Sequence, residues 1–399
     1  MKHLILFFLL ITFGLSAQLK PILFQFKTDT VLTWHYQFGD EFSNATIDQN
    51  RWIPRYPWGG LLLDQSQWST PEMIHVQNGW LQLTADQYGK KAKVENWMIN
   101  QEQARDLKID IKNDSVYLDY LTSCLWSKDT FSYGYFECRA IVPDGQGLWP
   151  AFWLYGQNQK DEIDFMEMKG ERPYDIHVDI HLPQRKDYVK NKFGIKKDWG
   201  GWVGMAPKLT GDTLIFSGVW LPNSLTYFVN GTPVSHFNGD FQTAMNLIVN
   251  LAVARDGYAF NPGPNDQTQF PANFQVDYVR VWNLDPQKSK PFEFQDQKIA
   301  SDVSFRPREI QKKVGLIYPK KELSKELCFV SLIPIGAQQY AIQYNGNEDF
   351  EISFEGEEKQ IENRIKGKNG NIIDLQNAPN NFSIIITCRN QKVEFFPLK

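Results

Sequence analysis

The sequence predicts an all-β protein, in which a two-sheet β-sandwich precedes a smaller C-terminal β-rich domain. Between Phe38 and Trp282, short segments alternate apolar and polar residues with a period of two. Glycine, proline, asparagine and aspartate separate these segments, and Asn230-Gly231 is a hairpin signal. Helical periodicity is scarce and short. This combination is typical of two antiparallel sheets packed face to face.

Seven segments carry the alternation most clearly and are predicted to be strands or hairpins of the sandwich. Two charged stretches between them, 106–114 and 184–199, are predicted to be solvated loops. The strand segments are GWLQLTA (79–85), SYGYFECRAIVP (132–143), IHVDIHLP (176–183), TLIFSGVWL (213–221), LTYFVNGTPVSHF (225–237), NLIVNLAV (246–253) and FQVDYVRVW (274–282).

The N-terminus predicts a cleaved secretory signal peptide over residues 1–17. A short basic start is followed by an apolar run from Leu4 to about Phe13 and then by small residues. The run is too short for a membrane-spanning helix, and no other segment is long enough to span. We therefore expect a secreted protein (extracellular, periplasmic or on the cell surface) with no membrane span, and we expect a monomer.

The C-terminal residues predict a separate unit. After Trp282 a polar, proline-containing stretch predicts a linker, so that residues 18–284 form the sandwich and residues 285–399 form the C-terminal domain. Apolar segments such as 328–336 and 382–388 indicate strands there, but no chemical motif accompanies them. We expect an accessory or sorting role for this domain.

Charge and composition limit the partners. The chain has 42 basic and 46 acidic residues, and no long basic block is interleaved with aromatics, which argues against a nucleic-acid partner. Aromatic residues make up 14%, including 13 tryptophans. These favour a ligand with flat apolar faces, such as sugar rings, although packing alone can also use them.

The four cysteines, Cys124, Cys138, Cys328 and Cys388, allow three disulfide pairings. An exported chain permits disulfides. Cys138 alternates in phase with core residues and is predicted to be a small core side chain. Cys328 and Cys388 both lie in apolar segments of the C-terminal domain, so a bridge between them is the favoured pairing.

The segment DEIDFMEM (161–168) carries acids in what is otherwise a buried strand. Glu162 and Asp164 share one face of a strand, whereas Glu167 has the opposite parity. The apolar pair Phe165-Met166 is where the period of two breaks, which predicts a one-residue β-bulge. With this bulge all three acids face the same way. A lone acidic pair would more simply be a solvated strand face.

Neighbouring segments supply aromatic and histidine side chains. In GLWPAFWLYG, Trp149 and Trp153 share one face, where they suit either stacking on sugar rings or burial in the core. His177 and His181 share a face in IHVDIHLP, but the further ligands of a zinc site are missing from this spacing. Two carboxylates on one face are what glycoside hydrolysis requires, one as nucleophile and one as proton donor.

The chain resembles glycoside hydrolase family 16, the laminarinases, lichenases, agarases and relatives. The resemblance lies in FGDEFS (38–43), DQNRW (48–52), residues 131–156, the bulged E-x-D-x-x-E motif and FPANFQVDYVRVW (270–282). It implies a β-jelly roll whose concave face carries the cleft, and hydrolysis that retains the anomeric configuration. The site residues that it implies are Glu162 as nucleophile, Asp164 as assisting acid, Glu167 as general acid/base, His181 beside that acid/base, and Trp149 and Trp153 as substrate-binding aromatics.

The resemblance also implies a structural calcium ion on the convex side, and no cofactor for catalysis. Glu41 and Gly79, through their backbone, and Asp277 match the family's calcium ligands. Oxygen-only ligation of this kind suits calcium. Asp277 in a strand pair would alternatively meet Arg280.

We therefore expect a secreted, endo-acting, retaining β-glycan hydrolase. The first substrate guess is β-1,3-glucan or mixed-linkage glucan, and algal galactan is the second. A non-catalytic glycan-binding protein on the same fold is the alternative, but binding-only relatives typically lose one or both glutamates. Transglycosylation uses the same residues and is not separated from hydrolysis by the sequence. The last residues of the chain also faintly resemble the sorting domains of exported surface proteins.

Overall fold

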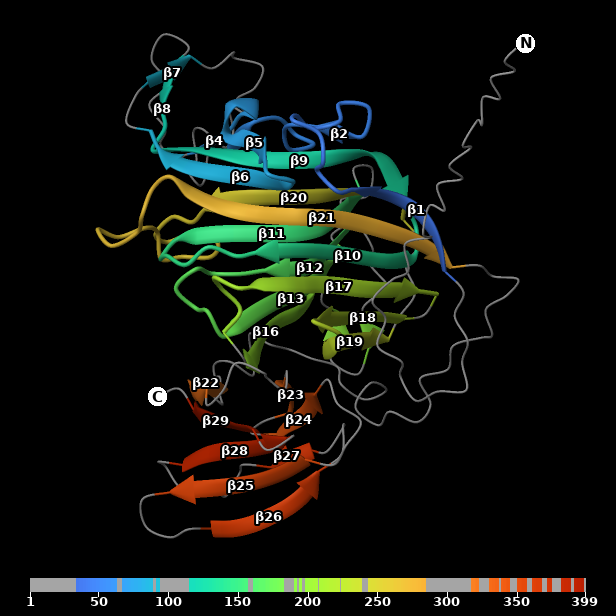
Figure 1. Cartoon of the computed structure of the whole chain (residues 1–399), viewed down its shortest axis with the longest axis vertical. Coiled ribbons are helices and arrows are strands. Elements are labelled where there is room, and N and C mark those ends of the chain that lie inside the picture. Colours follow the sequence, from blue (N-terminus) through green and yellow to red (C-terminus); the bar gives the residue numbers. More distant parts are fainter. Residues whose placement is uncertain are drawn as a thin grey trace, which may run out of the picture.

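A computed structural model describes the chain from Trp34 onward, and nearly all of its regular structure is β-strand (Figure 1). The one short helix among the labelled elements is the 3-10 turn Pro71–Met73. The all-β prediction is confirmed. Within the described part, no helix has the length and apolar character needed to cross a bilayer. The described residues are 34–62, 67–88, 91–93, 115–156, 161–182, 190–191, 194–195, 198–206, 208–222, 224–238, 243–284 and, for their backbone, the strands between 317 and 397.

One layer of the sandwich is called the back sheet here. In it, β1 and β6 meet end to end along one side of β21. Its order is β5-β6-β21-β10-β17-β18-β19, and β1 follows β6 along the same side of β21. The bounds are β1 Trp34–Asp40, β5 Ile74–Gln77, β6 Trp80–Gln87, β10 Gly134–Ile141, β17 Thr213–Leu221, β18 Ser224–Val229, β19 Thr232–Asn238 and β21 Ala272–Leu284.

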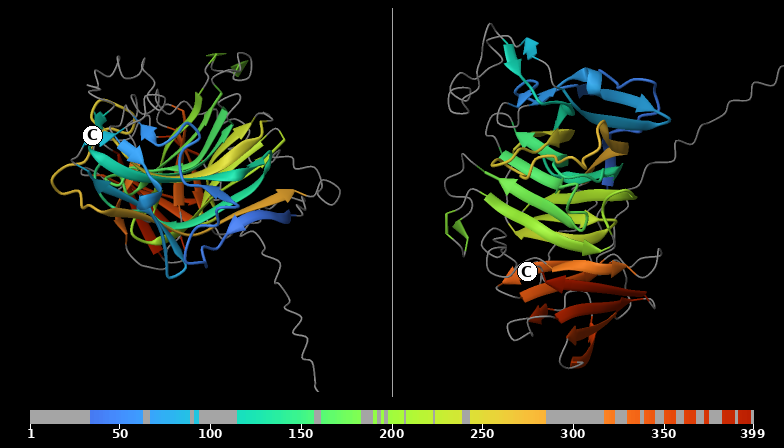
Figure 2. Two further views of the ribbon diagram at one scale, coloured as in Figure 1. Left: turned by 90° about the horizontal axis from the view of Figure 1, so that it is seen from above. Right: turned by 90° about the vertical axis from the view of Figure 1, so that its left-hand side faces the viewer.

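The other layer, called the front sheet here, runs in the order β2-β9-β20-β11-β12-β13-β16. The two layers lie face to face and curve together (Figure 2). The bounds are β2 Trp52–Ile53, β9 Tyr120–Phe131, β11 Leu148–Gly156, β12 Asp161–Glu167, β13 Asp175–His181, β16 Asp198–Ala206 and β20 Met245–Val253; the short strands are β3 Leu61–Leu62, β4 Gln67–Ser69, β7 Lys91–Lys93, β8 Ser115–Tyr117, β14 Lys190–Asn191 and β15 Gly194–Ile195.

The core fills the space between the two sheets. Alternate residues of each strand point into it, because successive side chains of a strand leave on opposite faces. Phe165 of β12 stands at its centre and contacts the rings of Phe136, Phe152 and Tyr227. Burying an aromatic ring of this size stabilises the fold by about 1.5–3 kcal/mol. Cys138 is also fully buried there, as predicted.

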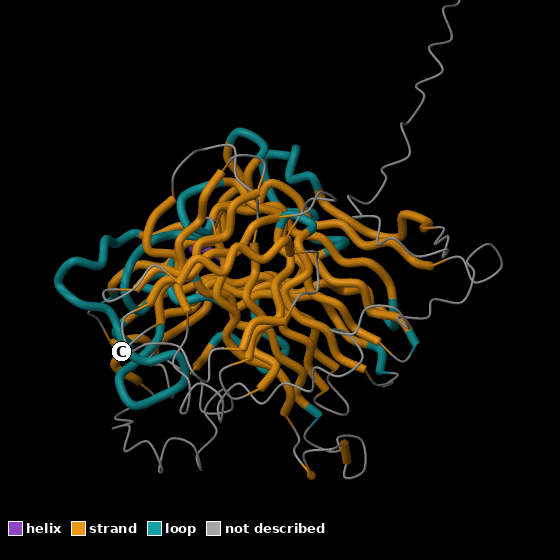
Figure 3. Tube along the Cα trace, turned by 90° about the horizontal axis from the view of Figure 1, so that it is seen from below, coloured by secondary structure: helices purple, strands orange, loops and turns teal. Residues whose placement is uncertain are grey.

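Strands dominate the described chain, and loops join them at the edges of the layers (Figure 3). In the C-terminal part, one sheet has the order β22-β29-β28-β25-β26, while β23 pairs with β24 on one side and with β16 on the other. The bounds are β22 Ile317–Glu322, β23 Val330–Gly336, β24 Gln339–Tyr344, β25 Phe350–Gly356, β26 Ile361–Gly367, β27 Ile372–Asp374, β28 Phe382–Cys388 and β29 Gln391–Pro397.

Some predictions fall outside the described residues. The signal peptide, residues 1–17, and most of the linker after Leu284 lie there, as does Cys328 of the favoured bridge. The domain boundary at 284/285 and the Cys328–Cys388 bridge therefore stay predictions. Cys124 and Cys138 are both buried free thiols.

Candidate active site

The bulge in β12 lies where the sequence predicts it. Against β13, Asp164 pairs with Asp179 and Glu167 pairs with His177, so Phe165 and Met166 together oppose the single residue between those partners. Against β11 the register also shifts at this point. Phe165 and Met166 are both buried in the core. The extra residue turns Glu167 to the front face of the front sheet, beside Glu162 and Asp164.

Glu162 and Asp164 form a hydrogen-bonded pair in this acidic cluster. Burial raises the pKa of Glu162 from 4.5 to about 7, the nearby imidazole of His181 opposes this rise, and the charge of Glu167 adds to it. Burial also raises the pKa of Asp164 well above its ordinary value, and Glu162 and Glu167 raise it further. Asp164 is 2% exposed. Near neutral pH the pair therefore retains a proton, chiefly on Asp164.

Glu167 is held by one contact at each carboxyl oxygen. Trp149 donates from Nε1 to Oε1 over 3.0 Å, and His177 Nδ1 lies 2.9 Å from Oε2. Glu167 is 8% exposed. Two such contacts fix the orientation of the carboxyl group, as a positioned acid or base requires. Trp149 therefore acts on Glu167 through its N–H as well as presenting a ring.

The histidine beside Glu167 is His177, so the expectation that His181 lies there is wrong. His181 is the cross-strand partner of Glu162, four residues further along β13. Its Nε2 lies 3.6 Å from Oδ2 of Asp164. The antiparallel register explains the difference: Glu162 pairs with His181, and the bulge places Glu167 opposite His177, so each glutamate faces its own histidine. Both histidines do lie on the front face, as their spacing predicted.

Asp179 is a site residue that the sequence reasoning did not single out. It is the cross-strand partner of Asp164, and it lies between the two histidines, with Oδ2 3.7 Å from Nε2 of each. The signal was present in DIHVDIH, because a period of two places both aspartates and both histidines on one face.

Aromatic side chains lie on the β11 side of the acids. Trp153 is 6% exposed and donates from Nε1 to Asn250 Oδ1 over 2.7 Å. It is therefore largely buried on this face. Trp58 is 49% exposed, stacks on Tyr56 at 5.1 Å between ring centroids, and contacts Tyr155 at 5.5 Å. Tyr155 is the cross-strand partner of Glu162. Trp58 belongs to a loop without periodicity, which is why no sequence pattern marked it.

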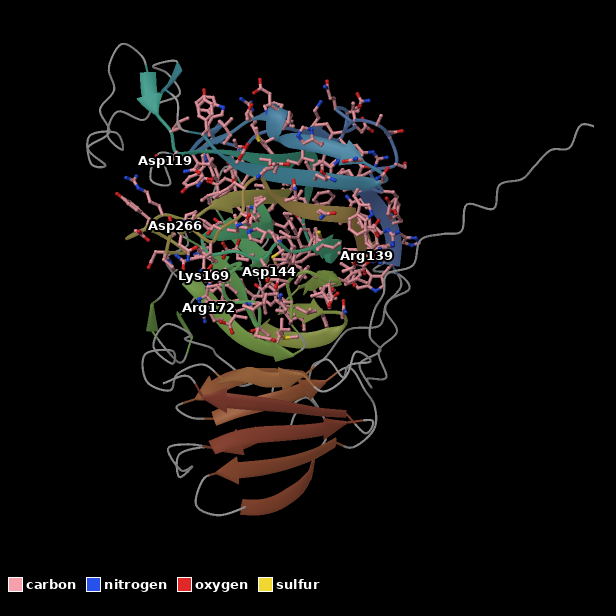
Figure 4. All side chains as sticks on the ribbon, turned by 60° about the vertical axis from the view of Figure 1, so that its left-hand side comes forward. Asp119, Arg139, Asp144, Lys169, Arg172 and Asp266 are labelled. Atoms are coloured by element: carbon pink, nitrogen blue, oxygen red, sulfur yellow. The ribbon has the colours of Figure 1, made fainter. Side chains whose placement is uncertain are left out.

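A second aromatic group lies on the His177 side. Phe260 stacks on Trp149 with 4.3 Å between ring centroids and 7° between planes, and it also contacts His177 and Trp202. Its φ of +57° lies in the left-handed region, which is rare for a bulky residue. Lys169 and Arg172 lie close together in Figure 4, with both cations over the Trp202 ring.

Among the residues that the structure describes, the acidic cluster offers ligand atoms for a metal. In the acidic cluster, Glu162, Asp164 and His181 each offer one, and these atoms all lie within 4.8 Å of one another. Two carboxylates and an imidazole suit a divalent transition metal. The acidic cluster needs the same groups for its own chemistry. A metal ion bound there would therefore occupy the carboxylate of Glu162.

The residues predicted to bind calcium meet on the back sheet. Strands β1 and β6 approach the same point of β21, at ladder partners Val279 and Val276, which places Glu41 and Gly79 beside Asp277. Glu41 forms a two-point ion pair with Arg280, both contacts 2.8 Å, so its carboxylate already has a cationic partner. Arg139, on the other side of the molecule from Lys169 in Figure 4, pairs with Asp277. A calcium ion would have to replace that guanidinium, and the site stays a prediction.

Comparison with known families gives one match. The model of the family described as "Glycosyl hydrolases family 16" matches residues 67–280. Among curated relatives, a glucan endo-1,3-β-glucosidase A1 of Niallia circulans is 28% identical over 273 residues, 61% of this chain and 37% of the relative. An endo-1,3-1,4-β-glycanase, EglC, of Rhizobium meliloti is 28% identical over 275 residues, 62% of this chain and 51% of the relative. The match thus spans about a third to a half of these two relatives.

Solved structures share the fold. The catalytic domain of an endo-1,3-β-glucanase (laminarinase) from Thermotoga petrophila superposes with a TM-score of 0.51 at 24% identity, over 64% of this chain and 99% of the other. Porphyranase B from Zobellia galactanivorans gives the same TM-score at 20% identity, over 67% and 98%. A glucanase and a porphyranase fit equally well, so the fold does not select between their substrates.

Proposed function

Because the chain belongs to glycosyl hydrolases family 16, we propose that it hydrolyses β-1,3-glucan or mixed-linkage β-1,3-1,4-glucan. The family makes it a retaining O-glycosyl hydrolase that acts within β-glycan chains. The glucan is supported by the two relatives named above, which are an endo-1,3-β-glucosidase and an endo-1,3-1,4-β-glycanase. The observation that carries the proposal is the bulge in β12, which brings Glu162, Asp164 and Glu167 to one face.

In the first step of the proposed mechanism, Glu162 attacks the anomeric carbon while Glu167 protonates the glycosidic oxygen. The aglycone part of the glycan leaves with that proton, and the glycone part stays on Glu162 as an ester. The Trp149 N–H and the His177 contact then face a newly formed carboxylate on Glu167. A hydrogen bond to the charged form stabilises it.

In the second step, water gives a proton to Glu167 and attacks the ester, which frees Glu162 and leaves the new hydroxyl on the original face of the sugar. Asp164 serves Glu162 in both steps. As the group that holds the proton of the pair, it donates a hydrogen bond to Glu162, and this favours the ionised nucleophile before attack and after release.

The test is a panel of laminarin, lichenan, agarose, carrageenan and porphyran, with products separated by size. We expect laminarin or lichenan to yield long oligosaccharides early, as an endo-acting enzyme produces. Cleavage of the galactans with both glucans left intact would overturn the glucan assignment. Products longer than the substrate, formed when an oligosaccharide acceptor is added, would indicate transglycosylation by the same residues.

We also propose that the protein is exported. The support is the apolar run after a short basic start at the N-terminus. The test is N-terminal sequencing of protein recovered outside the cytoplasm, which should begin close to Gln18. A chain that still begins at Met1 would overturn the proposal.

A further inference from the structure

We propose that Asp179 is a positioning residue, which holds His177 against Glu167 so that Glu167 can protonate the departing glycosidic oxygen. The inference rests on the role proposed above for Glu167 and adds a residue to that site. It starts from the carboxyl group of Asp179, which lies on the front face of β13 directly opposite Asp164.

The contacts form a chain between Asp179 and Glu167. His177 uses one ring nitrogen for each: Nδ1 lies 2.9 Å from Oε2 of Glu167, and Nε2 lies 3.7 Å from Oδ2 of Asp179. The partner of one ring nitrogen sets the orientation and the proton of the other. Whichever nitrogen carries the proton, the imidazole is oriented between two carboxyl groups. Loss of the Asp179 charge would remove the electrostatic contact at Nε2 of His177.

Asp179 is itself fixed from three directions. Its Oδ1 accepts the backbone N–H of Ile180 over 2.8 Å, and its backbone carbonyl accepts the Tyr227 hydroxyl, across the core, over 2.9 Å. On the neighbouring strand β16, Gly200 has φ of +140°, and a Cβ there would lie 2.4 Å from the Asp179 Cα. The backbone of β16 can approach this closely only because residue 200 is glycine.

Packing alone does not explain why an aspartate is buried at position 179, because the groups that face it are titratable. Asp179 is 4% exposed, and the titratable groups that face it are Asp164, Glu162 and Glu167 from β12, His177 and His181 from its own strand, and Tyr227 from the back sheet. Burial raises its pKa to about 6, and the two histidines oppose the rise. A neutral side chain would cost less here. Such costs are typical of groups retained for function.

Asp175 provides a matched control on the same strand. It lies four residues before Asp179, on the same face, and is also fully buried. Its carboxylate pairs with Arg172 instead of a histidine of the site. Asp175→Asn therefore removes a buried carboxylate from the same strand face without touching the Asp179–His177–Glu167 chain.

The experiment compares two substrates in Asp179→Asn, Asp175→Asn, His177→Asn and Glu167→Gln. One is an unactivated oligosaccharide, whose leaving group needs a proton. The other is the matching 2,4-dinitrophenyl glycoside, whose leaving group needs none. General acid catalysis contributes roughly 10²–10⁴-fold, so we expect kcat/KM of Asp179→Asn to fall at least about tenfold on the first substrate and little on the second. His177→Asn should show the same split, and Asp175→Asn should not.

Each outcome decides the proposal. An equal fall on both substrates, or no fall on either, would overturn the positioning role of Asp179. If Asp179→Asn fails to fold, His177→Asn carries the same test, because it breaks the chain at its middle member. If the loss of kcat/KM differs between the two substrates in Glu167→Gln but not in Asp179→Asn and His177→Asn, this inference alone is overturned. No split in Glu167→Gln overturns the proposed role of Glu167 and this inference with it.

Discussion

Gly218 of β17 lies directly behind Phe165 of β12, so close that a Cβ at residue 218 would stand 2.3 Å from the ring. Phe165 is one of the two residues that form the bulge, and its ring fills the centre of the core. The back sheet thus leaves room for the residue that turns Glu167 to the front face. A glycine on one sheet thereby supports the position of the proposed acid/base on the other.

Gly218→Ala should destabilise the fold by about 1–3 kcal/mol, because overpacking forces a buried ring off its rotamer or shifts the backbone. Chemical denaturation measures the change, and Gly257→Ala is not a suitable control because its φ is positive. The control is instead the double variant Gly218→Ala/Phe165→Leu, in which the smaller side chain at residue 165 leaves room for the added methyl group. A Gly218→Ala variant as stable as the wild type would show that Phe165 relaxes freely.

Deletion of Phe165 should restore a regular strand and move Glu167 to the core side. We expect loss of activity together with loss of stability, because a carboxylate would then be buried without its Trp149 and His177 contacts. Phe165→Leu, which keeps the residue count, should retain the register and most of the activity. Activity and melting temperature of both variants test this, and an active deletion variant would contradict the bulge as the device that places Glu167.

Glu162→Gln should abolish turnover and leave the fold intact, because an amide cannot form the glycosyl ester. Glu167→Ala should lose activity on natural glycan but regain turnover of an activated glycoside when azide is added, since the anion replaces the water that Glu167 would activate. The recovered product should be the β-glycosyl azide. Azide rescue of Glu162→Gln in the same way would reverse the two roles. No rescue of Glu167→Ala would refute the role of Glu167.

Stability and activity should respond to pH in opposite directions. The pKa of Glu162 is about 7 in the fold against 4.5 in the unfolded chain, so the fold binds its proton more tightly. The free energy of unfolding should therefore decrease as pH rises from about 4.5 through 7. Activity should increase over the upper part of that window, as Glu162 becomes ionised. Glu162→Gln should make this slope shallower without removing it, because the raised pKa values of Asp164 and Asp179 act in the same direction, and an unchanged slope would contradict the raised pKa of Glu162.

Calcium binding at Glu41, Gly79 and Asp277 should raise the melting temperature, and a chelator should lower it, by mass action. Arg139→Met should enlarge this calcium-dependent shift, because Asp277 would lose its guanidinium partner. Hydrolysis should stay nearly unchanged while the protein is folded. Identical melting curves with calcium and with chelator, in both proteins, would remove the ion from this site.

The sequence predicts the parts of this protein that depend on local periodicity. The strand pattern, the bulge at Phe165-Met166 and the shared face of the three acids all follow from a period of two and its single break. The partners of those acids depend instead on the register between strands. That register decides that His177, rather than His181, meets Glu167, and that Asp179 lies opposite Asp164. Phe260 reaches Trp149 from a loop, which no periodicity could reveal.

The pairing of β23 with β16 affects how this protein can be shortened. Gly204 of β16 pairs with Asp175 of β13 on one side and with Leu332 of β23 on the other. A chain cut after residue 284 would leave the outer side of β16 without its strand partner. Unpaired strand edges recruit other chains. Loss of solubility in such a shortened chain would then report an exposed edge, and would say nothing against the hydrolytic site two strands away.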